Sequence, residues 1–231
     1  MWFTRPEAIT DPEQLAGYAS MLSPLEKERQ QRFHFEKDRH RFLVSHALVR
    51  KVLSTYVDVA PGDWEFSVRQ RGRPEISGPA ITSGLRFNLS HTAGLAACVV
   101  ALDADCGIDV EQLTARGNQL AIAEKMFAAS EQAELKKLDG EAFQERFFTC
   151  WTLREAYSKA LGTGIGHTSN NYAFEIREGD QCGIRFDPSS GDQGEHWQFT
   201  VLRPDPDHLA AVAIRSGGLP DKPVIHETIV P

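Results

Sequence analysis

The chain has neither a surplus of basic residues nor a long apolar segment. Its 25 Lys and Arg residues are outnumbered by 32 Asp and Glu residues, which gives a formal net charge of −7. This balance argues against general nucleic-acid binding, which requires a basic surface. The longest apolar run, Leu95 to Leu102, is far shorter than the roughly 20 residues that cross a bilayer. We therefore expect no nucleic-acid partner and no membrane-spanning helix.

Cysteine is scarce and shows no spacing pattern. No two cysteines form a Cys-x-x-Cys pair, which argues against a zinc site and against a disulfide framework. The first residues of the chain lack the apolar core of a signal peptide. Reduced thiols and the missing export signal together predict a cytoplasmic protein. The four cysteines are Cys98, Cys106, Cys150 and Cys182.

Length and composition are those of an ordinary globular protein. At 231 residues and 41% apolar residues, the chain suffices for one large domain or two small ones. A chain of this size buries about 70% of its unfolded surface, which is enough for a real core.

Capping signals and residue periodicity predict both helices and strands. Helix starts are predicted at Pro12, after Asp11, and at Pro24, after Ser23 and with Glu26 at the third helical position. Further helices are predicted over 37–57, over 120–127, from Ser130 and over 143–161. Strands are predicted over 64–68, 85–89 and 95–102 and in a late meander over 174–176, 184–186, 197–201 and 209–215.

The segment Gly107-Ile-Asp-Val-Glu111 carries two carboxylates. If it is extended, Asp109 and Glu111 lie on one face, because side chains alternate along a strand. Two carboxylates on one face repel each other unless water or a hard divalent cation lies between them. By itself, Asp-x-Glu after a strand is more often a solvated face.

A third carboxylate lies in a predicted helix. Trp151, Glu155 and Lys159 are spaced i, i+4 and i+8 and share one stripe. The ordinary reading of the Glu155–Lys159 pair is a surface ion pair. Together with Asp109 and Glu111, however, the pair suggests Mg²⁺ and a phosphorylated substrate.

These segments, together with a third motif, resemble a known family. The third motif is Phe-Asn-Leu-Ser-His-Thr at residues 87–92, and an apolar strand separates it from the Asp-x-Glu segment. The three motifs, their order and the chain length resemble the Sfp-type 4′-phosphopantetheinyl transferases. The similarity extends upstream to residues 22–26 and 32–50.

The resemblance implies a fold and an activity. The fold is α+β, a pseudo-dimer of two similar halves, here 1–104 and 105–231, with the active site between them. A faint repeat, Leu-Ala-Ala at residues 95–97 and 209–211, fits two such halves. The activity is Mg²⁺-dependent transfer of 4′-phosphopantetheine from coenzyme A to a serine of an apo acyl or peptidyl carrier protein. Two halves in one chain predict a monomer.

Site residues follow from the same resemblance. Mg²⁺ is expected on Asp109, Glu111 and Glu155, and Lys159 would offset charge on the leaving 3′,5′-ADP. The general base is expected to be Glu155, with Glu111 or a water on the metal as alternatives. The coenzyme's phosphates are expected to contact Arg41, Arg73, Ser90 and His91; Arg39 and Arg50 are expected to form a solvated edge.

The segment after Glu111 is the expected carrier-docking region. Met126 and Phe127 are its apolar candidates, and a place in the helix core is an equally good reading of both. Arg116 and Lys125 are its basic candidates, because carrier proteins are acidic.

Two other functions use the same motifs. One is a Mg²⁺-dependent phosphodiesterase or pyrophosphatase built on the same carboxylates. The other is a non-catalytic carrier-binding protein, which the complete carboxylate set disfavours. A serine hydrolase is rejected, because Ser90 and His91 are neighbours on a predicted strand and point apart.

Overall fold

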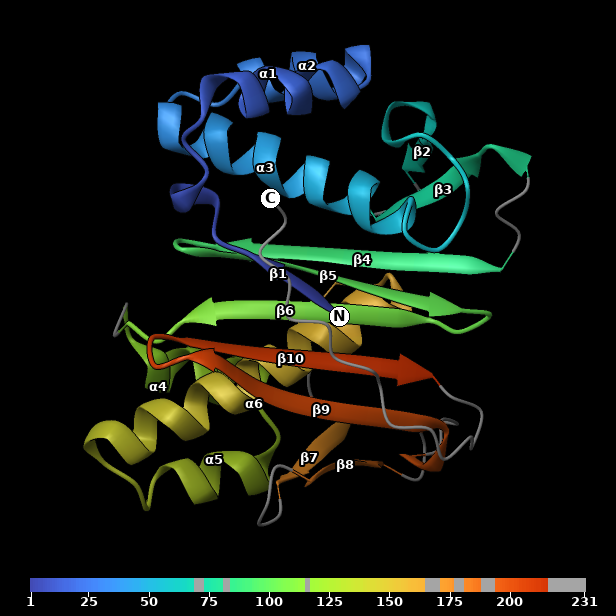
Figure 1. The fold of residues 1–231 in the computed structure, drawn as a ribbon. Coiled ribbons are helices and arrows are strands. Elements are labelled where there is room, and N and C mark those ends of the chain that lie inside the picture. Colours follow the sequence, from blue (N-terminus) through green and yellow to red (C-terminus); the bar gives the residue numbers. More distant parts are fainter. Residues whose placement is uncertain are drawn as a thin grey trace. The chain divides into compact units, whose positions relative to one another are not determined.

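The chain forms two compact units, each with its own sheet and core (Figure 1). The computed structural model describes residues 1–68, 73–80, 84–114, 117–164, 171–176, 181–187 and 194–215. Within this part of the chain, unit 1 comprises residues 1–103 and unit 2 begins at residue 104. Helices and antiparallel strands occur in both units, so the predicted α+β class is confirmed.

Unit 1 is built on a three-stranded antiparallel sheet in the order β1-β5-β4. The long helix α3 packs against this sheet, and Leu48, Val52 and Leu53 of the helix join Phe87 and Ala96 of the strands in one core. The strand β1 was not predicted, because three residues are too few for a periodic pattern. The bounds are β1 Trp2–Thr4, β4 Leu85–Thr92, β5 Leu95–Leu102 and α3 Glu36–Leu53.

The remaining elements of unit 1 surround α3. The predicted helix starts are confirmed: Asp11 accepts hydrogen bonds from Glu13 and Gln14, and Ser23 and Glu26 form a reciprocal capping box. A two-stranded hairpin, β2-β3, packs against β4 through β3. The bounds are α1 Pro12–Met21, α2 Pro24–Gln31, β2 Glu65–Val68 and β3 Pro74–Gly78, with short 3-10 turns at Pro6–Ala8 and Pro61–Asp63.

Unit 2 is built on a five-stranded antiparallel sheet in the order β6-β10-β9-β8-β7. The predicted late meander is confirmed, and β6 joins it beside β10. The longest helix, α6, packs against β6 and β10. The bounds are β6 Cys106–Gln112, β7 Tyr172–Ile176, β8 Gln181–Phe186, β9 Trp197–Asp205, β10 His208–Arg215, α4 Gln119–Met126, α5 Ala129–Leu135 and α6 Gly140–Leu161.

In each unit, a buried arginine on the long helix pairs with a carboxylate on a short neighbouring helix. Arg50 on α3 is only 1% exposed and lies 2.5 Å from Glu26 on α2, so the expectation that it forms a solvated edge was wrong. Arg154 on α6 is equally buried and pairs with Glu131 on α5. Burying a charge is costly unless it is paired, which explains why each guanidinium has a carboxylate partner.

The two acidic partners share a second task. Glu26 and Glu131 each occupy the third position of a short helix, and each carboxylate accepts a hydrogen bond from the backbone N–H at that helix's start. The start of α5 differs from the prediction because Glu131 supplies this cap. The helix therefore begins at Ala129, and Ser130 lies inside it.

Among the helices that the structure describes, none combines the length and apolar character of a membrane span.

Candidate functional site

The Asp-x-Glu segment forms the strand β6, as predicted. Asp109 is 4% exposed and pairs with Ala211 of β10 across the sheet, while Glu111 is half-buried and pairs with Leu209. Their spacing of two places both side chains on one face. The strand therefore presents two carboxylates to a single neighbour.

That neighbour is α6. Lys159 donates to Asp109 with Nζ 2.7 Å from Oδ1, and Trp151 donates to Glu111 with Nε1 3.0 Å from Oε1. The helix ends as predicted, with Gly162 in the left-handed conformation at φ 68°. The stripe of Trp151, Glu155 and Lys159 thus faces the two strand carboxylates. Sequence reasoning had placed Trp151 on this stripe but did not foresee its contact with Glu111.

Glu155 lies within the electrostatic reach of both strand carboxylates. Burial, followed by the charge of Asp109, raises the pKa of the Glu155 carboxyl from 4.5 to about 7. Lys159 opposes this shift, and Glu111 adds to it. Three carboxylates and one lysine thus form a cluster whose acidic charge is only partly neutralised.

The chemistry of this cluster fits a hard divalent cation. All three carboxylates offer oxygen ligands, which Mg²⁺ and Ca²⁺ prefer, and their mutual repulsion is what a divalent ion would relieve. The ligands are not preassembled, however. Within the described residues, no three Asp, Glu, His or Cys side chains stand in a geometry that could hold a metal. In this arrangement Lys159 contacts Oδ1 of Asp109, so its ammonium already compensates part of the charge that a cation would neutralise.

The motif Ser90-His91 lies on β4, in unit 1. Ser90 is 7% exposed and His91 is exposed, so the two side chains point to opposite faces of the strand. This arrangement agrees with the rejection of a serine–histidine dyad.

Arg41 lies close to the turn that follows this motif. One oxygen of Glu7, Oε1, is 3.2 Å from Nη2 of Arg41 and 3.3 Å from the backbone N of Gly94, in the turn between β4 and β5. Arg41 also lies 3.5 Å from Asp38. These contacts and the neighbouring guanidinium outweigh burial and hold the pKa of Glu7 below its usual value. Glu7 was not singled out from the sequence, because it lies 34 residues before Arg41.

The other predicted site residues are Arg73 and the candidates for carrier docking. Arg73 stands just before β3 and is 3.8 Å from Glu75. Phe127 is 1% exposed inside a core cluster of unit 2, so the core reading holds for it, and Met126 packs against the same cluster. Lys125 is exposed on α4, and Arg116 lies outside the described residues.

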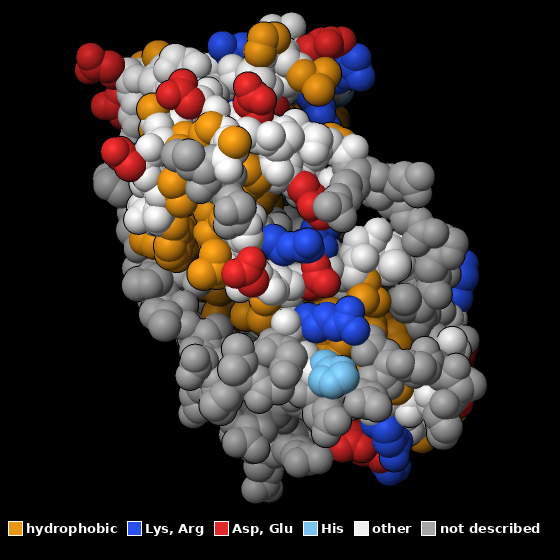
Figure 2. All heavy atoms as spheres, turned by 90° about the vertical axis from the view of Figure 1, so that its right-hand side faces the viewer, with side chains coloured by type: hydrophobic (Ala, Val, Ile, Leu, Met, Phe, Trp, Pro, Cys, Tyr) orange, Lys and Arg blue, Asp and Glu red, His pale blue; other side chains and the backbone are white. Residues whose placement is uncertain are grey.

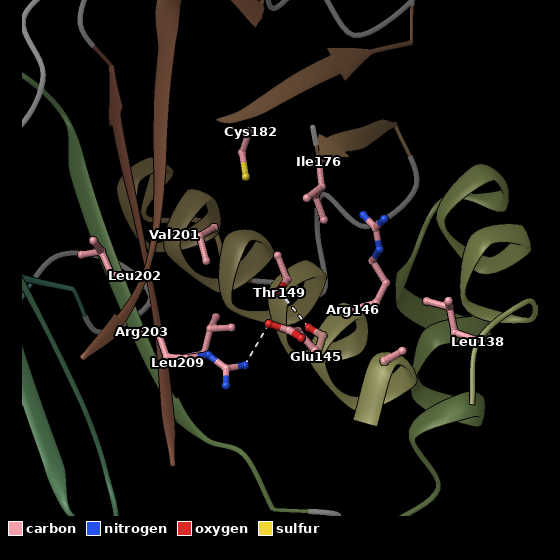
Figure 3. A pocket seen from close by; sticks show the side chains of 11 residues that line it. Leu138, Glu145, Arg146, Thr149, Ile176, Cys182, Val201, Leu202, Arg203 and Leu209 are labelled. Atoms are coloured by element: carbon pink, nitrogen blue, oxygen red, sulfur yellow. Dashed lines mark hydrogen bonds and ion pairs between the residues drawn. The ribbon is translucent and has the colours of Figure 1, made fainter. Parts of the chain in front are cut away.

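A pocket of about 370 Å³ opens at the other end of α6 (Figure 3). Its rim carries an ion pair between Glu145 and Arg203, 2.9 Å apart, and its walls combine polar and apolar side chains in about equal measure. Glu145 precedes Glu155 by ten residues, which is about 15 Å along a helix. None of the predicted site residues lines this pocket, so it is separate from the carboxylate cluster.

Figure 2 shows charged side chains of both signs among the described residues of one face.

Comparison with known proteins identifies the family of the chain. The model of the 4′-phosphopantetheinyl transferase superfamily matches residues 105–213, and the model of the 4′-phosphopantetheinyl transferase N-terminal region matches residues 10–103. The 4′-phosphopantetheinyl transferase HetI of Nostoc is 34% identical over 91% of this chain and 86% of its own length.

Two further relatives agree with this match. The 4′-phosphopantetheinyl transferase psf-1 of Bacillus pumilus is 30% identical over 75% of this chain and 70% of its own length. The 4′-phosphopantetheinyl transferase Sfp of Bacillus subtilis is 28% identical over 77% of this chain and 76% of its own length. The two family models together match most of the chain, and HetI is 34% identical over 91% of it: the chain belongs to the 4′-phosphopantetheinyl transferase superfamily.

Proposed function

We propose that the protein transfers 4′-phosphopantetheine from coenzyme A to a serine of an apo acyl or peptidyl carrier protein and releases 3′,5′-ADP. The observation that carries this proposal is the cluster of Asp109, Glu111, Glu155 and Lys159, formed by β6 and α6 in a chain of this family. A group-transfer enzyme acting on a diphosphate needs charge compensation more than covalent help from the protein.

Bonds and protons balance in this transfer. The serine oxygen forms a bond to the phosphorus that bears pantetheine, and the bridging P–O bond to the nucleotide breaks. The serine proton passes to a base, and 3′,5′-ADP leaves with the bridging oxygen. When bound, a divalent ion such as Mg²⁺, held by Asp109, Glu111 and Glu155, would neutralise the diphosphate and orient it.

Glu155 is the candidate base. Without a bound cation its pKa is about 7, and a base works best when its pKa lies close to the working pH. Glu111 and a water molecule are the other candidates for this role. Lys159, which now compensates Asp109, would offset the negative charge of the leaving group.

The residues proposed to bind the phosphates of the nucleotide belong to unit 1. His91 is exposed on β4 and Arg41 lies close to the β4–β5 turn, so both are suited to bind an anion there. A phosphate that binds Arg41 would replace Glu7 as its partner. Ser90 and Arg73 complete the proposed set. The carrier would dock beyond β6, where Lys125 offers an exposed positive charge and Phe127, being buried, does not contribute.

The enzyme is proposed to act as a monomer in the cytoplasm. Both units belong to one chain, and each has a complete core of its own. All four cysteines are free thiols, which suits a reducing compartment. Light scattering of the purified protein tests the monomer directly.

The deciding experiment uses coenzyme A, Mg²⁺ and a panel of purified apo-carrier proteins, read by intact-protein mass spectrometry. Transfer predicts that a carrier gains the phosphopantetheine mass and that Asp109→Ala abolishes the gain. A matched surface variant, Arg32→Ala, should behave as wild type, because Arg32 makes only an exposed pair with Glu28.

Each rival function predicts a different result. Release of 3′,5′-ADP without any carrier would support a phosphodiesterase or pyrophosphatase instead. Binding of carrier without turnover, unchanged by Asp109→Ala, would support a non-catalytic carrier-binding protein.

A further inference from the structure

Trp151 is held in one orientation by its own helix. Its ring lies parallel to that of Phe147, with centroids 6.3 Å apart and an interplanar angle of 11°. Phe147 in turn stacks on Phe127, 5.5 Å away, and on Phe143, 6.4 Å away. This run of aromatic rings belongs to a buried cluster of unit 2. Packing against Phe147 therefore helps to set the direction of the Trp151 indole N–H.

The N–H meets Glu111. Nε1 of Trp151 lies 3.0 Å from Oε1 of Glu111, although the two residues are 40 positions apart in the chain. An indole nitrogen can only donate a hydrogen bond, so this contact fixes one carboxylate oxygen and with it the rotamer of the side chain. The hydrogen bond thus restrains the Glu111 carboxylate in the protein without a ligand.

The two strand carboxylates receive different kinds of partner from α6. Lys159 is a flexible cation that competes with a divalent ion for the charge of Asp109. Trp151 is neutral and rigid, so it orients Glu111 while leaving the full negative charge of the carboxylate in place. Ligands with such a supporting hydrogen bond bind a metal more tightly, because the partner maintains their orientation.

We propose that Trp151 is a positioning residue for Glu111: its indole N–H, aligned by the aromatic stack, holds the carboxylate in the orientation that binds the divalent ion. This inference rests on the proposed function, because it assigns the orientation of one ligand in the same site. It also gives the stack of Phe127, Phe143 and Phe147 a role beyond filling the core.

The substitution Trp151→Phe tests the inference, because phenylalanine keeps a stacking ring and removes the N–H. Mg²⁺ is titrated by calorimetry into protein that holds coenzyme A, with no carrier present, so that no turnover occurs. We expect the Mg²⁺ dissociation constant to rise by about tenfold or more. In steady-state assays, the Mg²⁺ concentration needed for half-maximal rate should rise more than kcat falls at saturating Mg²⁺.

Trp64→Phe in unit 1 is the matched control. Its Nε1 donates to Ser54 Oγ at 2.9 Å, and the residue is 2% exposed, so the variant loses an indole hydrogen bond of the same kind away from the carboxylates. It should lower the melting temperature without changing Mg²⁺ affinity. A second variant, Phe147→Leu, keeps the N–H but removes the stacking partner, and we expect a smaller loss of Mg²⁺ affinity.

The outcomes separate the two proposals. If wild type binds Mg²⁺ and the dissociation constant of Trp151→Phe lies within twofold of the wild-type value, Trp151 only packs in the core. The inference is then overturned, and the proposed function stands. If wild type itself neither binds Mg²⁺ nor modifies a carrier, the proposed function fails, and the inference fails with it.

Discussion

Gly107 of β6 lies directly against the backbone of Ala156 in α6. A β-carbon at residue 107 would overlap the carbonyl oxygen of Ala156 and would stand close to the backbone N of Ala160. The strand and the helix therefore approach each other as closely as a glycine allows. This close approach brings Asp109 and Glu111, two and four residues further along the strand, within reach of Lys159 and Trp151.

The substitution Gly107→Ala should push β6 away from α6. Because the clash is with backbone atoms, no side chain can move aside, and we expect a loss of at least about 1–3 kcal/mol of unfolding free energy together with most of the activity. Urea denaturation and the carrier-modification assay measure the two effects. Gly183→Ala in β8 is the control, because a β-carbon there meets nothing within 4 Å. Equal stability of the two variants would contradict the role given to Gly107.

Glu155→Gln should cripple turnover while retaining the fold, because it removes the candidate base and a proposed ligand from a half-buried position. We expect a loss of at least about 100-fold in kcat, within the range for removing a general base. Circular dichroism would confirm the fold, and exposed Glu141→Gln on the same helix should leave kcat unchanged. A normal rate in Glu155→Gln would remove Glu155 from the mechanism.

The same substitution should also change how stability depends on pH. The folded-state pKa of Glu155 is raised to about 7, so the folded protein binds more protons than the unfolded chain between about pH 4.5 and 7. The contribution of Glu155 to the unfolding free energy is therefore fully present below pH 4.5 and is lost as the pH rises through 7. Without divalent ions, Glu155→Gln should gain stability over wild type between pH 5 and pH 8, on the order of 1–2 kcal/mol after solvent screening.

Urea titrations in EDTA at pH 5 and pH 8 measure this difference. Added Mg²⁺ should reverse its sign at pH 8, because only wild type has the complete carboxylate set. A pH-independent difference between the two proteins would show that burial and the acidic neighbours do not raise the pKa of Glu155.

The buried pair of Arg154 and Glu131 should be essential to unit 2. Arg154 also lies over the rings of Phe127 and Tyr172, at 5.3 and 4.6 Å, so it joins α5, α6 and β7. Glu131→Gln leaves a buried guanidinium without its counterion, which we expect to cost about 3–5 kcal/mol in thermal or urea unfolding. Glu28→Gln, in an exposed pair with Arg32, should cost less than about 1 kcal/mol. Restoration of stability in the double variant Glu131→Gln, Arg154→Met, which keeps a side-chain oxygen at residue 131 for the Ala128 N–H, would show that the single loss came from the uncompensated charge of Arg154.

Glu26 should make unit 1 sensitive to acid. Burial opposes its ionisation, but the hydrogen bonds from His46 and from the Ser23 N–H, with the charges of His46 and Arg50, lower its pKa to about 2. Its contribution is therefore complete above about pH 4.5 and is lost as the pH falls towards 2. Wild type should lose stability over this interval more steeply than Glu26→Gln, by roughly 1–2 kcal/mol after solvent screening. Parallel acid titrations followed by fluorescence measure the slopes, and identical slopes would contradict the assignment.

Signals that act over a few residues predicted much of the fold. Asp11, Ser23 with Glu26, and Gly162 marked helix ends correctly, because a cap and the groups it satisfies lie within one turn. The strand over 95–102 was also predicted correctly, because a continuous apolar run lies within the strand itself; it is the central strand of its sheet. The carboxylates of β6 and the stripe of α6 were placed on the correct elements from spacing alone.

Features that depend on distant partners could not be found in this way. Arg50 was assigned to a solvated edge because helical periodicity does not reveal Glu26, 24 residues earlier. The hydrogen bond from Trp151 to Glu111 and the link from Arg41 through Glu7 to Gly94 likewise join residues far apart in the chain. Such contacts appear only when the sheet and helices are packed.

The ion pair of Lys159 with Asp109 has a consequence for how the protein tolerates chelation. A site of three acidic groups normally loses its shape when its cation is stripped, but here an internal ammonium takes over part of that charge. In the proposed metal site Lys159 would thus act as the counterion when the cation is absent, and we expect metal depletion to leave a folded, inactive protein that regains activity when the cation is restored.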